Sequence, residues 1–433
     1  MKISWHETTT PESSLLPYQD NLTAYAEVLK NVWESRNYDA PESSLNLPFD
    51  GMLLKSVNDV AALLRSEKLR FVVVIGIGGS NLGAKALYDA LYGYLDALEI
   101  ERRPRAIFLD TIDVEYLNHT AQLLLGLSNP LEVAIVIISK SGTTTETVAN
   151  AAVLFQRLSE KFPDLYSRTA VVTDEGSALQ TLATEQKMHV LTMPQQVGGR
   201  YSVFSAAGLL PLALLGANLE EFRRGASEVV SMALEGSDRS CEESAALLAH
   251  AFETGFKIHD VFLFSPRLES VGRWYRQLLA ESIGKEREVS GATLHVGLTP
   301  TVSIGTTDLH SMAQLTFAGP RERITTFVHV RGVDAPDRVH AGTLFSSLTP
   351  MIAERSLGEI LEATLRGVEQ AYKTRELPFI MCDLEGVTEH EIGAFMQYSM
   401  LQVMFLGKLL QVNAFDQPAV EVYKEKTRHL LTT

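Results

Sequence analysis

The feature that most constrains the fold is a repeated alternation of short aliphatic runs with turns and helical stretches. The runs at 71–75, 106–109, 133–138 and 169–172 are rich in valine and isoleucine, and a turn follows each of them. Such runs are typical of strands buried on both faces of a parallel sheet, and the stretches between them have helical periodicity. The alternation therefore predicts an α/β fold in which helices flank a doubly wound, mainly parallel sheet.

The same alternation returns in the second half of the chain, where apolar runs at 261–264 and 324–330 enclose a helical pattern at 267–285. With 433 residues, of which 45% are hydrophobic, the chain is long enough for two domains with full cores. We expect an N-terminal helical segment at 1–47, a first domain at 48–200, connecting helices at 201–252, a second domain at 253–395, and a C-terminal helix and catalytic tail at 396–433.

Charge and cysteine content limit the partners that this chain can have. Thirty-eight Lys and Arg residues against 53 Asp and Glu give a formal net charge of -15, which repels nucleic acid and anionic membranes. Two cysteines are too few for a disulfide framework or a Cys-rich metal site. The first residues contain no apolar leader, and no apolar stretch is long enough to span a bilayer. We expect a cytoplasmic protein that binds neither nucleic acid nor membranes.

A hydroxyl-rich turn follows the run at 133–138. The segment reads SKSGTTTE and carries Ser139, Ser141, Thr143 and Thr144. Thr143 and Glu146 have the spacing of a capping box, which predicts a helix that begins near Thr143. Hydroxyls and free N–H groups at a helix N-terminus favour an anion, so the turn is a candidate phosphate site. A turn whose hydroxyls only cap the helix explains the same residues.

A glycine-rich turn follows the run at 71–75, where a nucleotide site is the first interpretation to test. Gly76 and Gly78 begin a GxG pattern, but the third glycine of GxGxxG is replaced by Asn81. Asp110, the acid at the end of the next strand, lies beyond the usual ribose-binding spacing of about 20 residues. The GK[ST] signature of a P-loop is also absent, because Lys85 stands between two alanines. The turn is therefore suited to a close approach of its backbone to another ligand.

One predicted helical face carries a candidate base. Gln277 and Glu281 lie four residues apart, so both side chains project from the same face. Leucines separate them in the sequence, which places Glu281 near a buried boundary and suits it to act as a general base. A solvated face on which Glu281 pairs with Lys285 fits the same spacing.

Other candidates lie in turns and near the chain end. Arg200 follows two glycines and is a candidate fixed cation, His310 lies between a Gly-Thr-Thr turn and a helix, and the segment at 412–426 carries Gln417 and Lys424. Arginines after glycines, lone histidines and tail lysines are more often solvated or structural. Each of these residues therefore carries weight only in combination with the others.

Taken together, six segments resemble, in the same order, the glucose-6-phosphate isomerase family in its short bacterial form. They are GIGGSNLG at 76–83, SKSGTTTET at 139–147, VGGRYS at 197–202, QLLAES at 277–282, DLHSMAQL at 308–315 and FDQPAVEVYK at 415–424. Two positions depart from the family pattern. Gln195 replaces an acidic residue or Asn, and Ala419 replaces a glycine, which tolerates φ angles that alanine does not.

The resemblance implies two sugar-isomerase (SIS) domains that interconvert glucose 6-phosphate and fructose 6-phosphate, a step of glycolysis and gluconeogenesis, through ring opening and a cis-enediol(ate). It assigns the proton shuttle between C2 and C1 to Glu281, oxyanion stabilisation to Arg200, and ring opening to His310 and Lys424. The implied substrate-binding residues are Gly79, Ser80, Ser139, Lys140, Ser141, Thr143, Thr144, Gln277 and Gln417. It also implies a homodimer in which the histidine completes the partner's active site. We expect no metal and no cofactor, because Arg200 meets the enediolate charge.

Other classes of protein remain open from the sequence alone. A non-catalytic SIS-domain sensor would need the hydroxyl turn but has no use for Glu281, His310 and Lys424 together. A nicotinamide-dependent oxidoreductase is disfavoured by the glycine spacing. Isomerases of mannose 6-phosphate share the enediol route, so a side activity on that sugar is also open.

Overall fold

The first half of the chain folds into a five-stranded sheet in the order β3-β2-β4-β5-β6, in which all neighbours are parallel. The computed structural model describes residues 1–5, 10–332 and 337–432. The strands of this sheet are β2 (Phe71–Ile75), β3 (Arg105–Leu109), β4 (Val133–Ile138), β5 (Thr169–Thr173) and β6 (His189–Thr192). Every residue of β2, β4 and β5 is buried, as expected for aliphatic runs in a parallel sheet.

Helices cover both faces of this sheet. They are α2 (Gly51–Leu64), α3 (Leu82–Leu91), α4 (Val114–Leu125), α5 (Thr145–Leu158), α6 (Ala178–Glu185) and α7 (Ala206–Leu215). Alternate residues of β2 face opposite layers, because side chains along a strand alternate. Val72 and Val74 share a core with α2, α3 and α7, whereas Val73 and Ile75 share a core with α4, α5 and α6. The sheet is therefore doubly wound.

The second domain contains a sheet in the order β1-β12-β11-β7-β10. Its parallel strands are β7 (Ile258–Leu263), β10 (Thr299–Ile304), β11 (Arg323–Val330) and β12 (Phe379–Leu384). At one edge, β1 (Lys2–Ser4) pairs antiparallel with β12. The sequence analysis did not foresee this strand, because three residues are too few to show an alternating pattern.

The order of the strands fixes where a ligand binds in such a sheet. In the first domain, β2 comes first in the chain and lies between β3 and β4. In an open α/β sheet, ligands bind at the carboxyl ends of the strands where the order reverses, here between β2 and β4. The glycine turn at 76–83 follows β2 and the hydroxyl turn at 139–147 follows β4. The predicted doubly wound α/β fold is confirmed, and both singled-out turns lie at its switch point.

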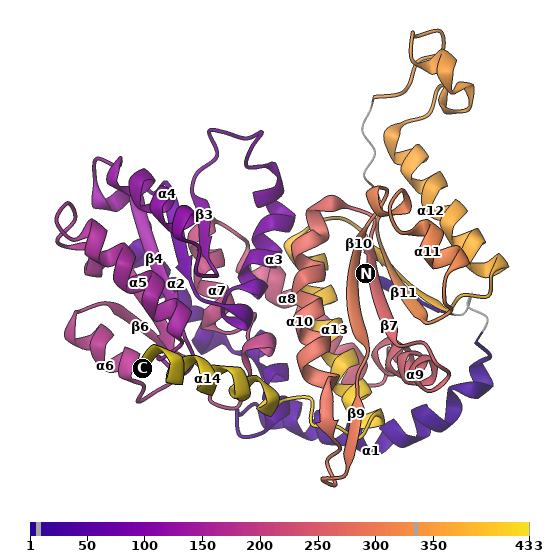
Figure 1. Cartoon of the computed structure of the whole chain (residues 1–433), viewed down its shortest axis with the longest axis horizontal. Coiled ribbons are helices and arrows are strands. Elements are labelled where there is room, and N and C mark those ends of the chain that lie inside the picture. Colours follow the sequence, from indigo (N-terminus) through magenta and orange to yellow (C-terminus); the bar gives the residue numbers. More distant parts are fainter. Residues whose placement is uncertain (6–9, 333–336, 433) are drawn as a thin grey trace.

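Helices join the two domains into one body (Figure 1). The remaining helices are α1 (Leu16–Ser35), α8 (Leu219–Leu234), α9 (Ser240–Glu253), α10 (Glu269–Ile283), α11 (Ala313–Ala318), α12 (Leu357–Thr374), α13 (Glu389–Leu409) and α14 (Glu421–Thr432). The almost wholly buried α13 packs against α8, α9 and α10, as expected from its apolar composition. In turn, α10 packs against α3 of the first domain. One large apolar core includes residues of both sheets.

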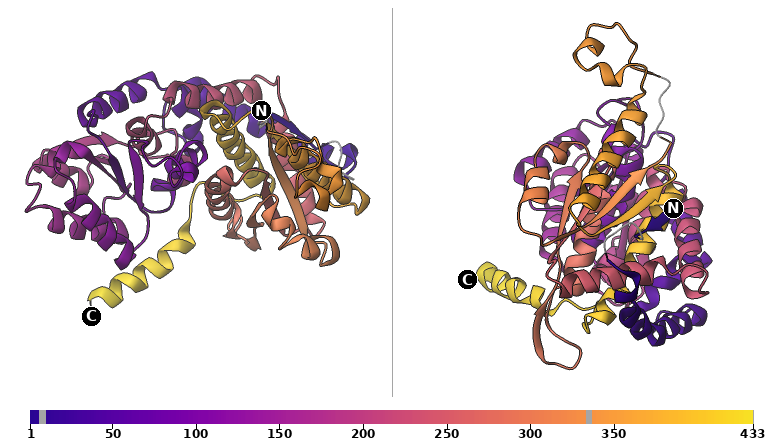
Figure 2. Two further views of the ribbon diagram at one scale, coloured as in Figure 1. Left: turned by 90° about the horizontal axis from the view of Figure 1, so that it is seen from above. Right: turned by 90° about the vertical axis from the view of Figure 1, so that its right-hand side faces the viewer.

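Three peripheral elements extend from this body. A hairpin of β8 (Lys285–Arg287) and β9 (Thr293–Val296) follows α10. An arm formed by residues 337–356 projects from the second domain before α12 (Figure 1). At the chain end, α14 has no buried residue and stands apart from the body (Figure 2). Among the residues described, no helix is both long enough and apolar enough to cross a membrane.

The start of α5 differs from the sequence prediction. The helix begins at Thr145, and Thr144 is its N-cap, without a hydrogen bond from a cap side chain. The predicted capping box between Thr143 and Glu146 is therefore wrong, because the helix starts too late for that spacing. The Oγ1 atom of Thr143 instead lies 3.3 Å from Oγ of Ser141. The hydroxyls of this turn are thus not used to cap the helix.

Candidate active site

The glycine turn lies directly against the turn that carries Arg200. A Cβ atom on Gly79 would stand 2.1 Å from the carbonyl carbon of Gly199, so only glycine permits this approach. Gly78 adopts a φ of +58°, and a Cβ atom there would lie 3.0 Å from Nε2 of Gln277 on α10. The glycines therefore bring the first domain against both the arginine turn and α10. This close packing explains the glycine turn without a nucleotide.

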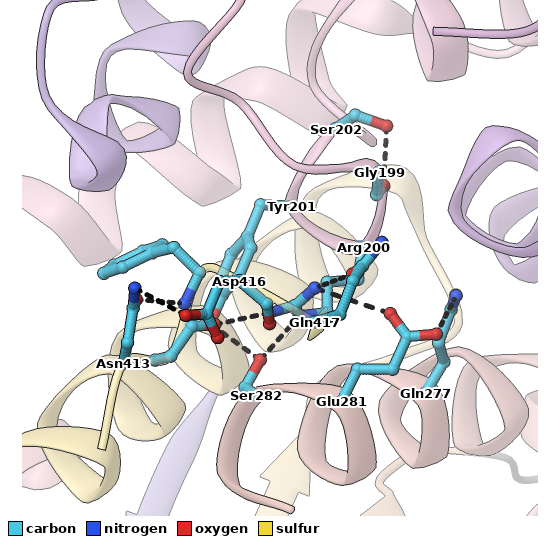
Figure 3. Close-up of polar contacts among 12 residues, drawn as sticks. Gly199, Arg200, Tyr201, Ser202, Gln277, Glu281, Ser282, Asn413, Asp416 and Gln417 are labelled. Atoms are coloured by element: carbon cyan, nitrogen blue, oxygen red, sulfur yellow. Dashed lines mark hydrogen bonds and ion pairs between the residues drawn. The ribbon is translucent and has the colours of Figure 1, made fainter. Parts of the chain in front are cut away.

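Arg200 is the centre of a buried polar cluster (Figure 3). Its side chain is 1% exposed. Its hydrogen-bond acceptors are Ser282 Oγ (2.8 Å), Glu281 Oε2 (3.4 Å), Oε1 of Gln417, and the main-chain oxygens of Ala414 (2.6 Å) and Asp416 (3.1 Å). A guanidinium has five N–H donors and keeps its charge in proteins, so every donor of Arg200 has an acceptor. The structure therefore holds a permanent positive charge at a fixed position.

Glu281 lies beside this cation at the last turn of α10. One carboxylate oxygen accepts from Arg200, and the other accepts a hydrogen bond of 3.0 Å from Nε2 of Gln277, as the spacing of four residues predicted. The side chain of Glu281 is 29% exposed. The carboxylate is thus held on two sides and still open to solvent on another.

Lys285 does not pair with the carboxylate of Glu281, so the surface pair considered from the sequence is wrong. Its Nζ donates to the main-chain oxygen of Glu281 at 2.9 Å and to the main-chain and side-chain oxygens of Asp416. Burial lowers the pKa of Lys285, and the hydrogen bond to Asp416 opposes this shift. The acidic side chain of Glu281 therefore faces Arg200 and Gln277 rather than a lysine.

Two buried hydroxyl groups lie next to Arg200. The Oγ atom of Ser282 accepts from Arg200 and also lies 3.0 Å from the hydroxyl of Tyr201. Burial raises the pKa of Tyr201, which therefore remains a neutral phenol. Ser282 lies in the segment QLLAES but was not among the predicted site residues. Its contact with Arg200 spans 82 positions of the chain, which no local pattern reveals.

The hydroxyl turn forms a separate part of the site at the switch point. Ser139 is 1% exposed, and its Oγ atom lies 2.9 Å from Oγ1 of Thr144. Ser141 and Thr143 are exposed. The Nζ atom of Lys140 donates to the main-chain oxygens of Gln195 and Val197, 2.6 and 3.1 Å away. The lysine therefore ties the hydroxyl turn to the segment that leads into Arg200.

Several buried polar atoms near these groups have no hydrogen-bond partner among the described residues. They include Oγ1 of Thr147, in the first turn of α5, Oε1 of Gln277, and both side-chain polar atoms of Asn81 in the glycine turn. A buried polar atom without a hydrogen bond costs about 1–3 kcal/mol. Water or a bound polar ligand would relieve this cost. Thr147 lies in the segment SKSGTTTET but was not among the residues predicted to bind the substrate.

His310 and Lys424 do not join the cluster around Arg200. His310 is exposed in the turn after β10, shortly before α11. Lys424 lies on α14 and donates to Glu421 on the same helix at 2.8 Å. Within the described part of the chain, neither side chain has a hydrogen bond or ion pair with Arg200 or Glu281. One chain therefore assembles the carboxylate and the cation but not the two groups assigned to ring opening.

No group of three or more His, Cys, Asp or Glu side chains arranged to hold a metal ion occurs among residues 1–5, 10–332 and 337–432. The potential ligands at the site are instead hydroxyls, main-chain N–H groups, one guanidinium and one carboxylate. Hydroxyls and N–H groups suit a phosphoryl group. A guanidinium next to a carboxylate suits proton transfer with formation of an oxyanion.

A hydroxyl turn at the switch point of one doubly wound domain, and a guanidinium-held carboxylate on the other, define an α/β enzyme of the sugar-phosphate isomerase class. The model of the phosphoglucose isomerase family matches residues 64–433. The chain belongs to this family. A probable glucose-6-phosphate isomerase of Haloarcula marismortui is 31% identical over 90% of this chain and 84% of its own length. A glucose-6-phosphate isomerase of Shouchella clausii is 32% identical over 84% of this chain and 81% of its own length.

Solved structures have the same fold. A hypothetical protein from Thermus thermophilus matches with a TM-score of 0.84 and 28% identity, over 100% of both chains. A glucose-6-phosphate isomerase from Chlamydia trachomatis matches with a TM-score of 0.80 and 20% identity, over 99% of this chain and 88% of its own. Both domains and their connecting helices are therefore shared with these proteins.

Proposed function

We propose that Glu281 is the acid–base group with which this member of the phosphoglucose isomerase family interconverts glucose 6-phosphate and fructose 6-phosphate. Its carboxylate would take the proton from C2 of the open-chain aldose and return it to C1. A single group on one face of the substrate can reach two adjacent carbons. The observation that carries this proposal is the position of Glu281, held by Arg200 and Gln277 and 29% exposed. Positioned acid–base catalysis of this kind contributes roughly 10²- to 10⁴-fold.

Arg200 stabilises the enediolate in this mechanism. Proton removal from C2 of the aldose places negative charge on the former carbonyl oxygen of C1, and a preorganised cation lowers the energy of that charge without moving. The Nη1 atom of Arg200 now donates to Glu281 and Gln417. Those side chains are the partners that an enediolate oxygen would replace or share. The remaining donors keep the guanidinium in place meanwhile.

The phosphate binds at the hydroxyl turn in this proposal. Supporting this are the exposed residues Ser141 and Thr143 of the hydroxyl turn, with Ser80 and Gly79 in the glycine turn that follows the neighbouring strand, and the N-terminus of α5, which adds a favourable dipole. Buried Thr147 adds a hydroxyl without a partner among the described residues. The phosphoryl group does not react, so its binding energy holds the reacting carbons against Glu281.

A homodimer completes the site in this proposal. His310 and α14 are exposed, and both would meet a second copy of the chain. The apolar residues left on the surface support this: Val422, Tyr423, Leu430 and Leu431 on α14, and Leu344, Phe345, Leu348 and Met351 on the arm are each at least half exposed. An exposed group of apolar residues on each of these two elements is typical of an interaction surface. His310 and Lys424 then exchange protons at the ring and hydroxyl oxygens. We place the protein in the cytoplasm, consistent with two free, buried cysteines.

The test is the isomerase activity of a Glu281→Gln variant, measured with fructose 6-phosphate in a coupled assay that contains no added metal. Glutamine is close to glutamate in size and can still contact Arg200 and Gln277, but it cannot accept the C2 proton. We expect kcat to fall by about 10²-fold or more, with little change in the inhibition constant of inorganic phosphate. Glu286→Gln is the matched control, because Glu286 is exposed and its ion pair with Arg287 is long, at 4.0 Å. Near-normal turnover by Glu281→Gln would exclude it as the base.

A further inference from the structure

A segment without helix or strand follows α13 and carries Gln417 to Arg200, and one short 3-10 helix, Pro418–Val420, joins it to α14. Its main-chain oxygens at Ala414 and Asp416 accept from Nη2 of Arg200, and the ring of Phe415 packs against Tyr201 with ring centroids 5.4 Å apart. Residues 411–417 form no regular secondary structure, so their position depends on contacts with other parts of the chain. We name this segment the tail segment.

Lys285 makes the second set of contacts to the tail segment. Its side chain is 7% exposed, although Asp416 is 49% exposed. All three ammonium donors have acceptors: the main-chain oxygen of Glu281, the main-chain oxygen of Asp416, and Oδ1 of Asp416. The other carboxylate oxygen of Asp416 accepts from Nδ2 of Asn413 at 3.0 Å. Lys285 thus joins the end of the base-carrying helix to the tail segment.

We propose that Lys285 is a positioning residue that clamps the tail segment onto the last turn of α10. It holds Glu281 through the main-chain oxygen and Gln417 through its neighbour Asp416, and so fixes the spacing between the base and the arginine. This inference rests on the proposed role of Glu281. Lys285 touches no substrate atom in this account. The main-chain oxygen of Asp416 accepts hydrogen bonds from both Arg200 and Lys285, so two cations bind one peptide group.

Loss of the clamp has a specific consequence. The hydroxyl turn contacts neither Lys285 nor Asp416 by hydrogen bond or ion pair among the described residues, so phosphate affinity is independent of the clamp. The geometry at Glu281 is not independent, and a misplacement of about 1 Å at a reacting centre costs roughly 10²-fold in rate. The clamp should therefore act on kcat and not on phosphate binding.

The experiment compares Lys285→Met with Lys257→Met. Lys257 is an exposed lysine of the same domain whose Nζ donates to the main-chain oxygen of Phe252 at 2.6 Å, remote from Arg200. For Lys285→Met we expect kcat to fall by about 10- to 100-fold, an inhibition constant for inorganic phosphate close to that of wild type, and faster proteolysis within the tail segment. Lys257→Met should match wild type in all three measurements. Lys285→Arg should recover part of kcat, since it keeps the charge.

A second set of variants removes the carboxylate of Asp416, with which Lys285 pairs. Asp416→Asn keeps the main-chain oxygen, so its loss of kcat should be smaller, and the double variant should lose less than the two single effects combined. Unchanged kcat in Lys285→Met would overturn the clamp, as would a loss that is matched by equal weakening of phosphate inhibition. If Glu281→Gln retains activity, the proposed base is wrong. The proteolysis measurement then still tests the clamp by itself.

Discussion

The two halves of the proposed site differ in how completely one chain builds them. Arg200 is 1% exposed and has an acceptor for every donor, and it holds Glu281 in place. His310, in contrast, is exposed, and Lys424 pairs with its own helix neighbour Glu421. The charge that must be fixed throughout the reaction is therefore fixed by folding. The groups assigned to ring opening are left available to the substrate or to a second chain.

Removal of the fixed charge should have the largest effect. Arg200→Met leaves its buried acceptors unpaired, and breaking such a buried network costs about 3–5 kcal/mol. We expect isomerase activity below detection and a clearly lower free energy of unfolding in a urea titration. Arg273→Met is the control, since Arg273 is exposed and pairs with Glu269 on one helix. A free energy of unfolding within about 1 kcal/mol of wild type for Arg200→Met would contradict the central place given to this residue.

Mixing two inactive variants tests whether the open half is completed by a partner. If His310 serves the site of the other chain, a dimer of one Glu281→Gln chain and one His310→Ala chain contains one intact site. Statistical mixing makes half of the dimers mixed, so refolding the two variants together should recover about one quarter of wild-type activity, an expectation from symmetric two-site pairing.

The control mixes Glu281→Gln with Arg200→Met, whose altered residues lie in one cluster of the same chain. In this mixed dimer, each of the two sites lacks either Glu281 or Arg200. Little activity should therefore return. Equal recovery in both mixtures, or recovery in neither, would contradict a composite site that contains His310. The readout is the coupled assay, with the oligomeric state determined by sedimentation.

The contact between Gly79 and Gly199 tests the half of the site that one chain builds by itself. Gly79→Ala forces a Cβ to within 2.1 Å of the carbonyl carbon of Gly199, so the two turns must separate. Overpacking of this kind costs about 1–3 kcal/mol. We expect that loss in a urea titration, with reduced kcat. Gly51→Ala, at the start of α2 with no atom within 4 Å of the added carbon, should leave both unchanged. The packing argument is wrong if the two variants behave alike.

The exposed hydroxyls should have the smallest effect on stability, because their contribution is to substrate binding. Each of Ser141→Ala and Thr143→Val removes one hydrogen bond to a charged phosphate, which contributes roughly 1.5–3 kcal/mol. We expect KM and the inhibition constant of inorganic phosphate to rise about tenfold or more, with the unfolding midpoint unchanged. Ser159→Ala, at the far end of α5, serves as the control. A rise in KM without a rise in the phosphate constant would place the phosphate elsewhere.

The fold followed from the sequence where long buried segments gave strong patterns. The bounds of β2 and β4 agree with the predicted runs, because unbroken aliphatic stretches leave little choice of register. The three-residue β1 was missed because its only signal is a partner strand at the other end of the chain. The start of α5 was placed too early, since several adjacent threonines offer equivalent caps.

Local sequence singled out individual residues of the candidate site, but it did not reveal how they are arranged. The pairing of Gln277 with Glu281 follows from helical spacing. The contacts of Arg200 with Ser282 and Gln417 join residues 82 and 217 positions apart, and no local rule encodes them. Helical spacing also allows Lys285 to pair with Glu281, whereas in three dimensions the side chain of Asp416 in the tail segment accepts from Lys285 instead.

The central claim is that Glu281 contacts the two carbons between which hydrogen moves. The most direct measurement is a crystal structure with a bound phosphorylated hydroxamate that mimics the enediolate. We predict a carboxylate oxygen of Glu281 within about 3.5 Å of both mimicked carbons, an oxyanion near Arg200, and the phosphoryl group on the hydroxyl turn. A bound inhibitor whose mimicked carbons lie beyond van der Waals contact with Glu281 would contradict the account.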